Sequence, residues 1–260
     1  MTRMKITFLG NGDSLGTPRV YCECGVCEEA RAGGRNVRLR PSVWLECEGE
    51  EPMLLDCGPD WRLQMEKLSV KNVSQGLLTH AHFDHIGGLV EWADACRWLD
   101  ATATVHTPKE VIKEVLDRFP WIGSRLKLTE NDGGIRYGGW TIVPWRVNHG
   151  KNGYSYAYRF DHSASGRSWV YCSDSFDMSV EEKAPLMGVD LLVLGTSYYR
   201  EPYERETRSL YDVVEGLELV REAGVGQAVF THLSHDIDMR MDYGLPANVR
   251  LATEGLVLTI

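Results

Sequence analysis

Short apolar runs alternate with amphipathic stretches along most of the chain. Runs rich in β-branched, leucine and aromatic residues predict strands at 4–9, 43–47, 53–56, 76–79, 102–106, 140–147, 154–160, 168–172, 189–194, 227–230 and 256–260. Apolar positions at helical spacing predict helices at 61–68, 87–98, 108–119 and 209–223. The strands form two clusters, each trailed by helices, which predicts an α/β fold of two packed sheets with helices outside.

Composition narrows the class of protein. The chain has 260 residues, 43% of them hydrophobic and 25% charged, which is ordinary for a globular protein and excludes a disordered chain. We expect a single domain over 1–260. No apolar run is long enough to span a bilayer, and the first residues lack the apolar stretch of a secretory signal. The net charge of −9 argues against general binding of nucleic acid.

The cysteines divide into two groups. Seven cysteines, an odd number, together with the lack of a signal predict a reducing, cytoplasmic setting. Four of them stand in apolar contexts and are predicted to be small buried hydrophobes: Cys47, Cys57, Cys96 and Cys172. The other three crowd into the short stretch 22–27.

A dense group of metal-binding side chains follows the apolar run 76–78. His80 and His82 alternate along the chain and can face one ion, whereas Asp84 and His85 are adjacent and need a bend to reach a neighbouring ion. Imidazole and carboxylate together suit zinc, iron or manganese rather than calcium. The complete HxHxDH string at a strand end therefore predicts a metal site.

With this motif the sequence resembles the metallo-β-lactamase superfamily. That resemblance implies an αββα sandwich with a two-metal site at one edge. Further residues expected from the family occur here in order, each after a predicted strand: His149, Asp174 and His232. Asp56, before Gly58 at the end of an early strand, matches a residue that usually organises the loop rather than binding metal.

The resemblance also implies how the ligands divide. One divalent metal would take His80, His82 and His149, the other Asp84, His85 and His232, with Asp174 bridging both. Two metals, with zinc, manganese or iron as the candidates, would leave room for a bridging hydroxide as the nucleophile. The bridging aspartate favours a dinuclear hydrolase over a mononuclear iron enzyme, with Asp84 and Asp174 as the carboxylates implied in catalysis.

A second motif concerns a structural metal. Cys22, Cys24 and Cys27 form a CxCxxC arrangement, and His235, three residues beyond His232, is the predicted fourth ligand of a closed tetrahedral zinc site. The alternative is three unligated, redox-active thiols in a mobile loop. The arrangement resembles the phosphoribosyl cyclic phosphate phosphodiesterases of bacterial phosphonate breakdown, in which such a zinc pins an N-terminal loop, here around 20–28. Proteins of pyrroloquinoline quinone biosynthesis share a related cysteine cluster.

One feature departs from the phosphodiesterase subgroup. The subgroup has an additional active-site histidine before its final metal histidine, but 195–230 contains no histidine. Arg200 and Arg208 in that stretch are the predicted phosphate-binding residues, with a solvated surface position as the alternative for each.

The leading functional hypothesis is a phosphodiesterase acting on a small cyclic phosphate or nucleotide-like diester. Alternatives with the same metal core are a tRNA 3′-processing endonuclease, a lactone or thioester hydrolase, and a non-hydrolytic cofactor-biosynthesis protein. We expect a small phosphorylated substrate and no nucleic acid or membrane as partner, and the sequence leaves a homodimer open.

Overall fold

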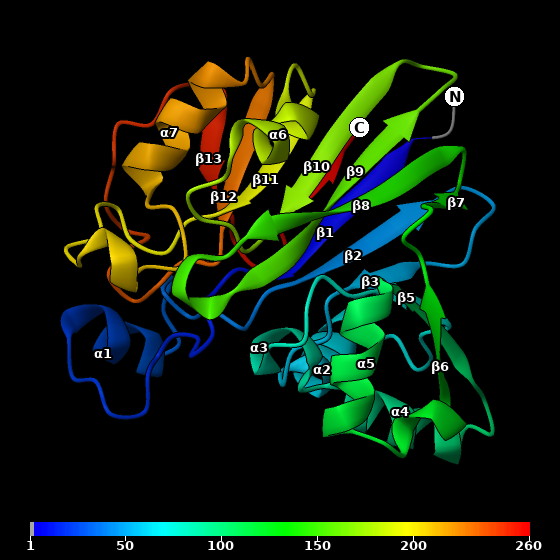
Figure 1. Cartoon of the computed structure of the whole chain (residues 1–260). Helices are drawn as coiled ribbons and strands as arrows, with labels where there is room; N and C mark the ends of the chain where they lie inside the picture. The colour runs from blue at the N-terminus through cyan, green and yellow to red at the C-terminus, as the bar shows by residue number, and fades with distance from the viewer. Residues whose placement is uncertain (1–2) are drawn as a thin grey trace.

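The structure, a computed structural model, describes residues 3–260 and contains two seven-stranded sheets packed face to face (Figure 1). The first sheet has the order β14-β1-β2-β3-β4-β5-β6. Its strands are β1 Met4–Gly10, β2 Ser42–Cys47, β3 Met53–Leu55, β4 Gln75–Leu77, β5 Ala103–Thr107, β6 Leu126–Glu130 and β14 Val257–Thr259. The second sheet has the order β13-β12-β11-β10-β9-β8-β7. Its strands are β7 Ile135–Tyr137, β8 Trp140–Asn148, β9 Tyr154–His162, β10 Arg167–Cys172, β11 Leu191–Gly195, β12 Gln227–Thr231 and β13 Val249–Leu251.

Helices cover the outer faces of both sheets (Figure 1). The first sheet carries α2 Trp61–Leu68, α4 Leu89–Trp98 and α5 Lys109–Arg118, and the short helix α3 Phe83–Ile86 precedes α4. The second sheet carries α6 Val180–Lys183 and α7 Val213–Glu222, whereas α1 Gly25–Arg31 lies in the loop between β1 and β2. Short 3-10 turns occupy Ile122–Ser124, Gly150–Asn152, Ala184–Leu186 and Arg205–Thr207. This arrangement confirms the predicted αββα sandwich.

The apolar alternation of the strands builds three cores. Inward-facing residues of both sheets form the central one, where the rings of Phe160 and Trp169 stack with centroids 3.9 Å apart beside buried Ile6 and Phe8. Each outer face buries its own helices, as with Trp92 of α4 on the first sheet. Every layer therefore depends on contacts between segments far apart in the sequence.

Some elements differ from the predicted ones. Helix α7 begins at Val213, not 209, because Asp212 caps it and forms a capping box with Glu215. Strand β14 crosses to the first sheet and pairs antiparallel with β1. The pattern also missed α1, α6, β6, β7 and β13, which are short or only partly apolar.

Strand direction brings several strand ends to one edge. Strands β8 and β10 both run antiparallel to β9, and β10, β11 and β12 are parallel. The carboxyl ends of β8, β10 and β12 therefore meet at the same edge of the second sheet. Within residues 3–260 no helix combines the length and apolar character needed to cross a membrane.

Candidate metal centre

The segments that follow four strands carry the predicted metal ligands to this edge. His80 and His82 follow β4, and Asp84 and His85 stand on α3. The remaining three follow β8, β10 and β12 and are His149, Asp174 and His232. All seven side chains except that of His82 are buried. The structure thus brings together every residue that the sequence predicts for the catalytic pair.

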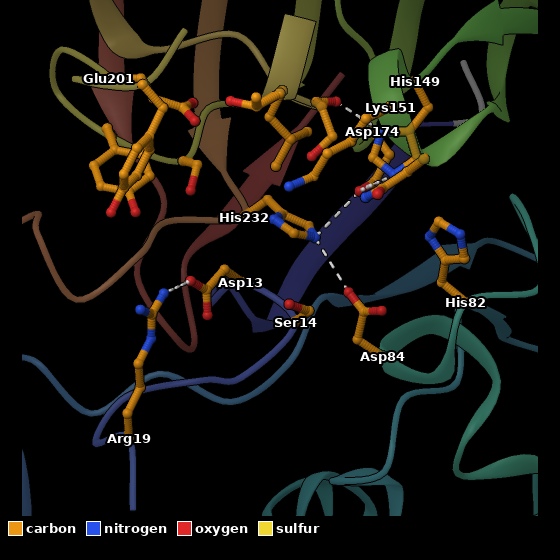
Figure 2. Close-up of a pocket in the computed structure, with 17 residues that line it drawn as sticks. Asp13, Ser14, Arg19, His82, Asp84, His149, Lys151, Asp174, Glu201 and His232 are labelled. Carbon is orange, nitrogen blue, oxygen red and sulfur yellow. Dashed lines mark hydrogen bonds and ion pairs between the residues drawn. The ribbon is translucent and has the colours of Figure 1, made fainter. Parts of the chain in front are cut away.

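The donor atoms gather in two groups that share Asp174. In the first, His80 Nε2 lies 2.8 Å from His82 Nδ1, and His149 Nε2 lies 3.6 Å from Asp174 Oδ1. In the second, Asp84 Oδ2 lies 3.2 Å from both His85 Nε2 and His232 Nε2. Figure 2 shows Asp84, His232 and Asp174 linked in this way across the cavity.

The position of Asp174 between the groups has a chemical consequence. Its Oδ1 lies 3.2 Å from His232 Nε2 as well as close to His149, and its Oδ2 lies 3.1 Å from His85 Nε2. One carboxylate oxygen thus faces the second group alone, while the other faces both. This placement suits a carboxylate that bridges two cations.

Two buried polar atoms of this centre lack a hydrogen-bond partner, which is what a set of metal ligands without its ion would show. His85 Nε2 and Asp174 Oδ2 are buried and 3.1 Å apart, yet neither makes a hydrogen bond within the described chain. Buried polar atoms without partners are rare in folded proteins. Unpartnered nitrogen and oxygen atoms that point toward a common position are typical of metal ligands. The mixture of imidazole and carboxylate suits zinc, manganese or iron.

Neighbouring groups hold the histidines in the tautomers that metal binding requires. His85 Nδ1 donates to Asp56 Oδ2 at 2.7 Å, and His149 Nδ1 donates to the Ser209 carbonyl oxygen at 2.7 Å. His80 Nδ1 lies 3.0 Å from Thr79 Oγ1, which itself donates to Asp56. The other ring nitrogen of each histidine is left with its lone pair toward the centre, as in most protein metal sites.

The pKa shifts reflect the concentration of carboxylates around this centre. Burial opposes the charged form of Asp174, but His232 and His85 outweigh it and hold the pKa of this carboxyl well below its ordinary value. Burial also opposes the charged form of His85, yet Asp174, Asp84 and Asp56 raise its pKa well above the usual range. Burial and the charge of His85 lower the pKa of His80. The low pKa values of Asp174 and Asp84 favour ionised carboxylates, whose charge attracts a cation.

The cysteine motif converges as well. His235 Nδ1 lies 3.3 Å from Cys22 Sγ, 3.6 Å from Cys24 Sγ and 3.4 Å from Cys27 Sγ. Tetrahedral zinc with bonds of about 2.3 Å to sulfur and 2.0 Å to nitrogen separates these atoms by about 3.5 Å. The four donors therefore fit one zinc ion, and all seven cysteines are unpaired.

The N-terminus of helix α1 stabilises the thiolate form of one cysteine of this cluster. Cys24 caps its N-terminus and accepts a hydrogen bond from the Cys27 N–H at 3.5 Å. Burial works against the Cys24 thiolate, but the Cys27 and Val26 N–H groups and the neighbouring thiols outweigh it and lower its pKa. A thiolate is the form of cysteine that binds metal.

Comparison with known proteins identifies the family. Residues 52–233, more than half of the chain, match the family model described as a beta-lactamase superfamily domain. The chain belongs to the metallo-β-lactamase superfamily. Its fold is similar to that of a crystallised diphosphatase from the PhnP family, with a TM-score of 0.85, 27% identity, and coverage of 100% of this chain and 98% of that one.

This chain matches only part of the length of its curated relatives. An octanoyltransferase of Porphyromonas gingivalis is 28% identical over 97% of this chain, which spans only 51% of that protein. Coenzyme PQQ synthesis protein B of Ruegeria pomeroyi is 35% identical over 40% of this chain and 38% of its own length. The chain thus spans about half of the first relative and less of the second.

A cavity of about 320 Å³ opens above the metallo-β-lactamase ligand set. The volume lies near the lower end of the range for small-molecule sites. Its lining is mostly polar and includes Asp13, Ser14, Arg19, Lys151, Asn152, Ser197, Tyr198, Glu201, Tyr203, Thr207, Ser209 and Leu210 (Figure 2). Sequence reasoning missed Lys151, although it stands two residues after His149, and Arg19, which stands just before the cysteines.

Neither predicted phosphate-binding arginine is among the described residues that line this cavity. Arg208 is buried, and its guanidinium donates to Glu215, with Nη1 3.0 Å from Oε1, while its Nε lies 3.3 Å from Glu201 Oε2. The expectation that Arg208 binds substrate is therefore corrected: carboxylates of the protein itself occupy its guanidinium. Arg200 is exposed and likewise lies outside the lining.

Proposed function

We propose that this superfamily member is a metal-dependent phosphodiesterase that cleaves a small cyclic phosphate or a nucleotide-like diester. One observation carries the proposal: seven convergent histidine and aspartate donors, with Asp174 between their two groups, stand beneath a small polar cavity. The cavity volume of about 320 Å³ favours a substrate of metabolite size over a folded RNA.

The proposed roles follow from the positions of the side chains. His80, His82 and His149 would hold one divalent cation, and Asp84, His85 and His232 the other, with Asp174 shared. Such a pair supplies Lewis acidity, which makes water nucleophilic near neutral pH and neutralises the charge of a phosphate in transition. The chain's own contribution is orientation, because Asp56 and the Ser209 carbonyl fix the ring planes of His85 and His149.

The similarity to the PhnP-family diphosphatase supports phosphate chemistry, since the two chains match over nearly their full lengths at 27% identity. The cysteine cluster would act mechanically. A closed Cys₃His zinc site leaves no position for water, so a zinc there would tie the loop around 20–28 to the segment after His232.

A second function is favoured by one relative. The match to an octanoyltransferase over 97% of this chain suggests an acyl ester or thioester substrate. A metal pair can also polarise an acyl carbonyl. The cavity lining weighs against this alternative, because Leu210 is its one aliphatic member among the described residues and an octanoyl chain needs an apolar surface.

A substrate panel with metal analysis distinguishes the two. The purified chain is loaded with zinc or manganese and assayed on bis-p-nitrophenyl phosphate, 2′,3′-cyclic nucleotides, p-nitrophenyl phosphate, lactones and octanoyl thioesters. We expect turnover of the diesters, weak or no turnover of the monoester, and loss of diesterase activity in Asp174→Ala. Efficient thioester or lactone hydrolysis with no diesterase activity under any metal would reverse the assignment.

A further inference from the structure

Arg38 is a buried cation that belongs to none of the candidate ligand sets. The residue is 1% exposed, and burial lowers its pKa only to about 10, so its guanidinium stays charged at neutral pH. Its four side-chain hydrogen bonds within residues 3–260 all go to uncharged oxygen atoms. Arginine is almost never fully buried unless it is paired with an opposite charge. The acceptors of this side chain therefore indicate what the buried charge does.

Two of these acceptors are the ends of one tight turn. Arg38 Nη1 donates to the carbonyl oxygen of Ser234, and Nη2 donates to the carbonyl oxygen of Ile237. The Ile237 N–H also donates to the Ser234 carbonyl oxygen, at 3.2 Å, and closes the turn 234–237. The planar guanidinium presents its donors in a fixed fork, so it holds both carbonyl groups at a set separation. This turn carries His235, the candidate fourth ligand of the cysteine cluster.

His232 stands just before the same turn and depends on its neighbours for support. Its backbone has φ +58°, which is uncommon for a residue other than glycine and persists only where the surroundings hold it. The next residue, Leu233, donates its N–H to the Asn11 carbonyl oxygen at 2.8 Å. Its own carbonyl oxygen accepts from the Asp13 N–H at 3.1 Å. The backbone on the C-terminal side of His232 is therefore fixed by an N-terminal loop.

That loop itself rests on Arg38. The Thr17 N–H donates to the Arg38 carbonyl oxygen and the Arg38 N–H donates to the Thr17 carbonyl oxygen, both at 2.9 Å. The Thr17 hydroxyl also accepts from Arg38 Nη1 at 3.3 Å. Gly12 packs closely on the same residue, because a Cβ at position 12 would lie 2.9 Å from Arg38 Cβ. The loop 11–17 thus meets the segment 232–237, which bears both histidines, at Arg38.

Asn36 extends the support beyond the turn. This fully buried side chain accepts from Arg38 Nη2 at 3.0 Å and from the Met239 N–H at 2.8 Å. It donates to Asp238 Oδ1 at 3.0 Å. Arg38 and Asn36 together therefore contact the segment 234–239 along its length.

We propose that Arg38 is a positioning residue shared by the two candidate metal sites. By holding the turn 234–237, it sets His235 against the cysteine cluster and, through the backbone between them, His232 against the shared ligand Asp174. Its described hydrogen bonds reach none of the donor atoms, so it acts through the histidines. The inference rests on the two candidate metal sites and not on which ester is cleaved.

Cobalt(II) distinguishes the two sites in solution. Cobalt bound to thiolates absorbs through sulfur-to-metal charge transfer, whereas cobalt bound only by imidazole and carboxylate does not. Titration of the metal-free protein therefore gives the affinity of the cysteine cluster, and elemental analysis of bound cobalt in a chelator buffer gives that of the catalytic pair.

Two substitutions separate the fork from the charge. Arg38→Lys keeps a positive charge but cannot hold both carbonyl groups in the same way, and Arg38→Met keeps only the length of the stem. Ile122→Ala is the control for lost stability, because this buried residue lies in a short turn that contacts α4 and β6.

Both Arg38 variants should bind cobalt about tenfold more weakly at each site, as is usual when the groups that orient metal ligands are removed. Ile122→Ala should bind cobalt like the wild type although its melting temperature falls. Wild-type affinity in Arg38→Lys would assign the effect to charge and overturn the proposal. Weakening of only one site, or equal weakening in Ile122→Ala, would overturn it as well.

Amide hydrogen exchange of the metal-free protein tests the contact without any metal. Residues 231–239 should exchange faster in Arg38→Met than in the wild type, while the strands of both sheets exchange as before; unchanged exchange would refute the positioning role. If Arg38→Met does not fold, Arg38→Lys decides both measurements. If the wild type takes up no cobalt, the candidate metal sites fail, whereas faster exchange of this segment would still show that Arg38 holds it.

Discussion

Asp56 offers a stringent test of how the candidate metal centre is built. Its carboxylate is fully buried and accepts from the Thr79 N–H at 2.9 Å, from the Thr79 hydroxyl at 3.0 Å and from the His85 ring at 2.7 Å. Its backbone also has φ +60°, a conformation that aspartate and asparagine tolerate better than alanine. The residue therefore supports both the loop and a proposed ligand without belonging to the donor groups.

The cost of removing it follows from these contacts. Asp56→Ala strands at least two buried donors at about 1–3 kcal/mol each, so the free energy of unfolding should fall by about 2–6 kcal/mol. Asp56→Asn keeps the left-handed backbone and one acceptor oxygen, so it should lose less. In both variants His85 loses its anionic partner, and affinity for the proposed metal pair should drop about 10–100-fold.

Two measurements check the prediction. Urea unfolding of the metal-free proteins gives the change in stability, and competition with a chelator of known affinity gives metal retention. Asp94→Ala, an exposed aspartate of α4, serves as the control and should behave like the wild type. The reasoning is refuted if Asp56→Ala unfolds within about 0.5 kcal/mol of the wild type, the usual range for a surface substitution, and retains metal equally.

Three further predictions concern separate parts of the molecule. Asp174→Ala should lose both cations of the catalytic pair, counted by elemental analysis, and activity with them; native metal content with full activity would contradict the shared-ligand assignment. Cys24→Ser should release about one zinc per chain and lower the melting temperature while the catalytic pair is retained, since closed zinc sites stabilise folding; an unchanged zinc count would contradict this. Arg208→Ala should destabilise the fold by about 1–3 kcal/mol, because it removes the guanidinium partner of the partly buried Glu201 and Glu215. Arg97→Ala breaks only an exposed pair with a side-chain exposure of 69% and should change urea unfolding little.

Much of the architecture could be predicted because strands and helices that pack against the core have apolar residues at regular spacing in the sequence. The strands β8 to β12 and the helices α2, α4 and α5 appear in the sequence as apolar alternation or helical spacing, within a few residues of their observed bounds. Short elements at the periphery, such as α1 and β13, bury few residues and leave almost no periodic signal. The local pattern also could not predict that β14 pairs with β1, because these two strands lie at opposite ends of the chain.

The candidate site also has features that the sequence predicts and features that only the fold decides. The sequence by itself predicted a metal site, because HxHxDH concentrates scarce metal-binding side chains in one loop. The resemblance to the family, rather than local spacing, predicted the remaining donors His149, Asp174 and His232. The sequence also predicted the CxCxxC cluster. Clusters of metal-binding side chains at these spacings have few other uses, so local sequence was enough to predict that these two segments bind metal.

Only the tertiary structure decided which positively charged side chain is unpaired and exposed to the cavity. In the sequence Arg208 and Lys151 are both isolated positive charges, and the arginine has the better geometry for phosphate. The fold places Arg208 against Glu201 and Glu215, and leaves Lys151 unpaired at the cavity among the described residues. The availability of a charge depends on which carboxylates fold against it, and those contacts are set by packing between elements rather than by the residues on either side.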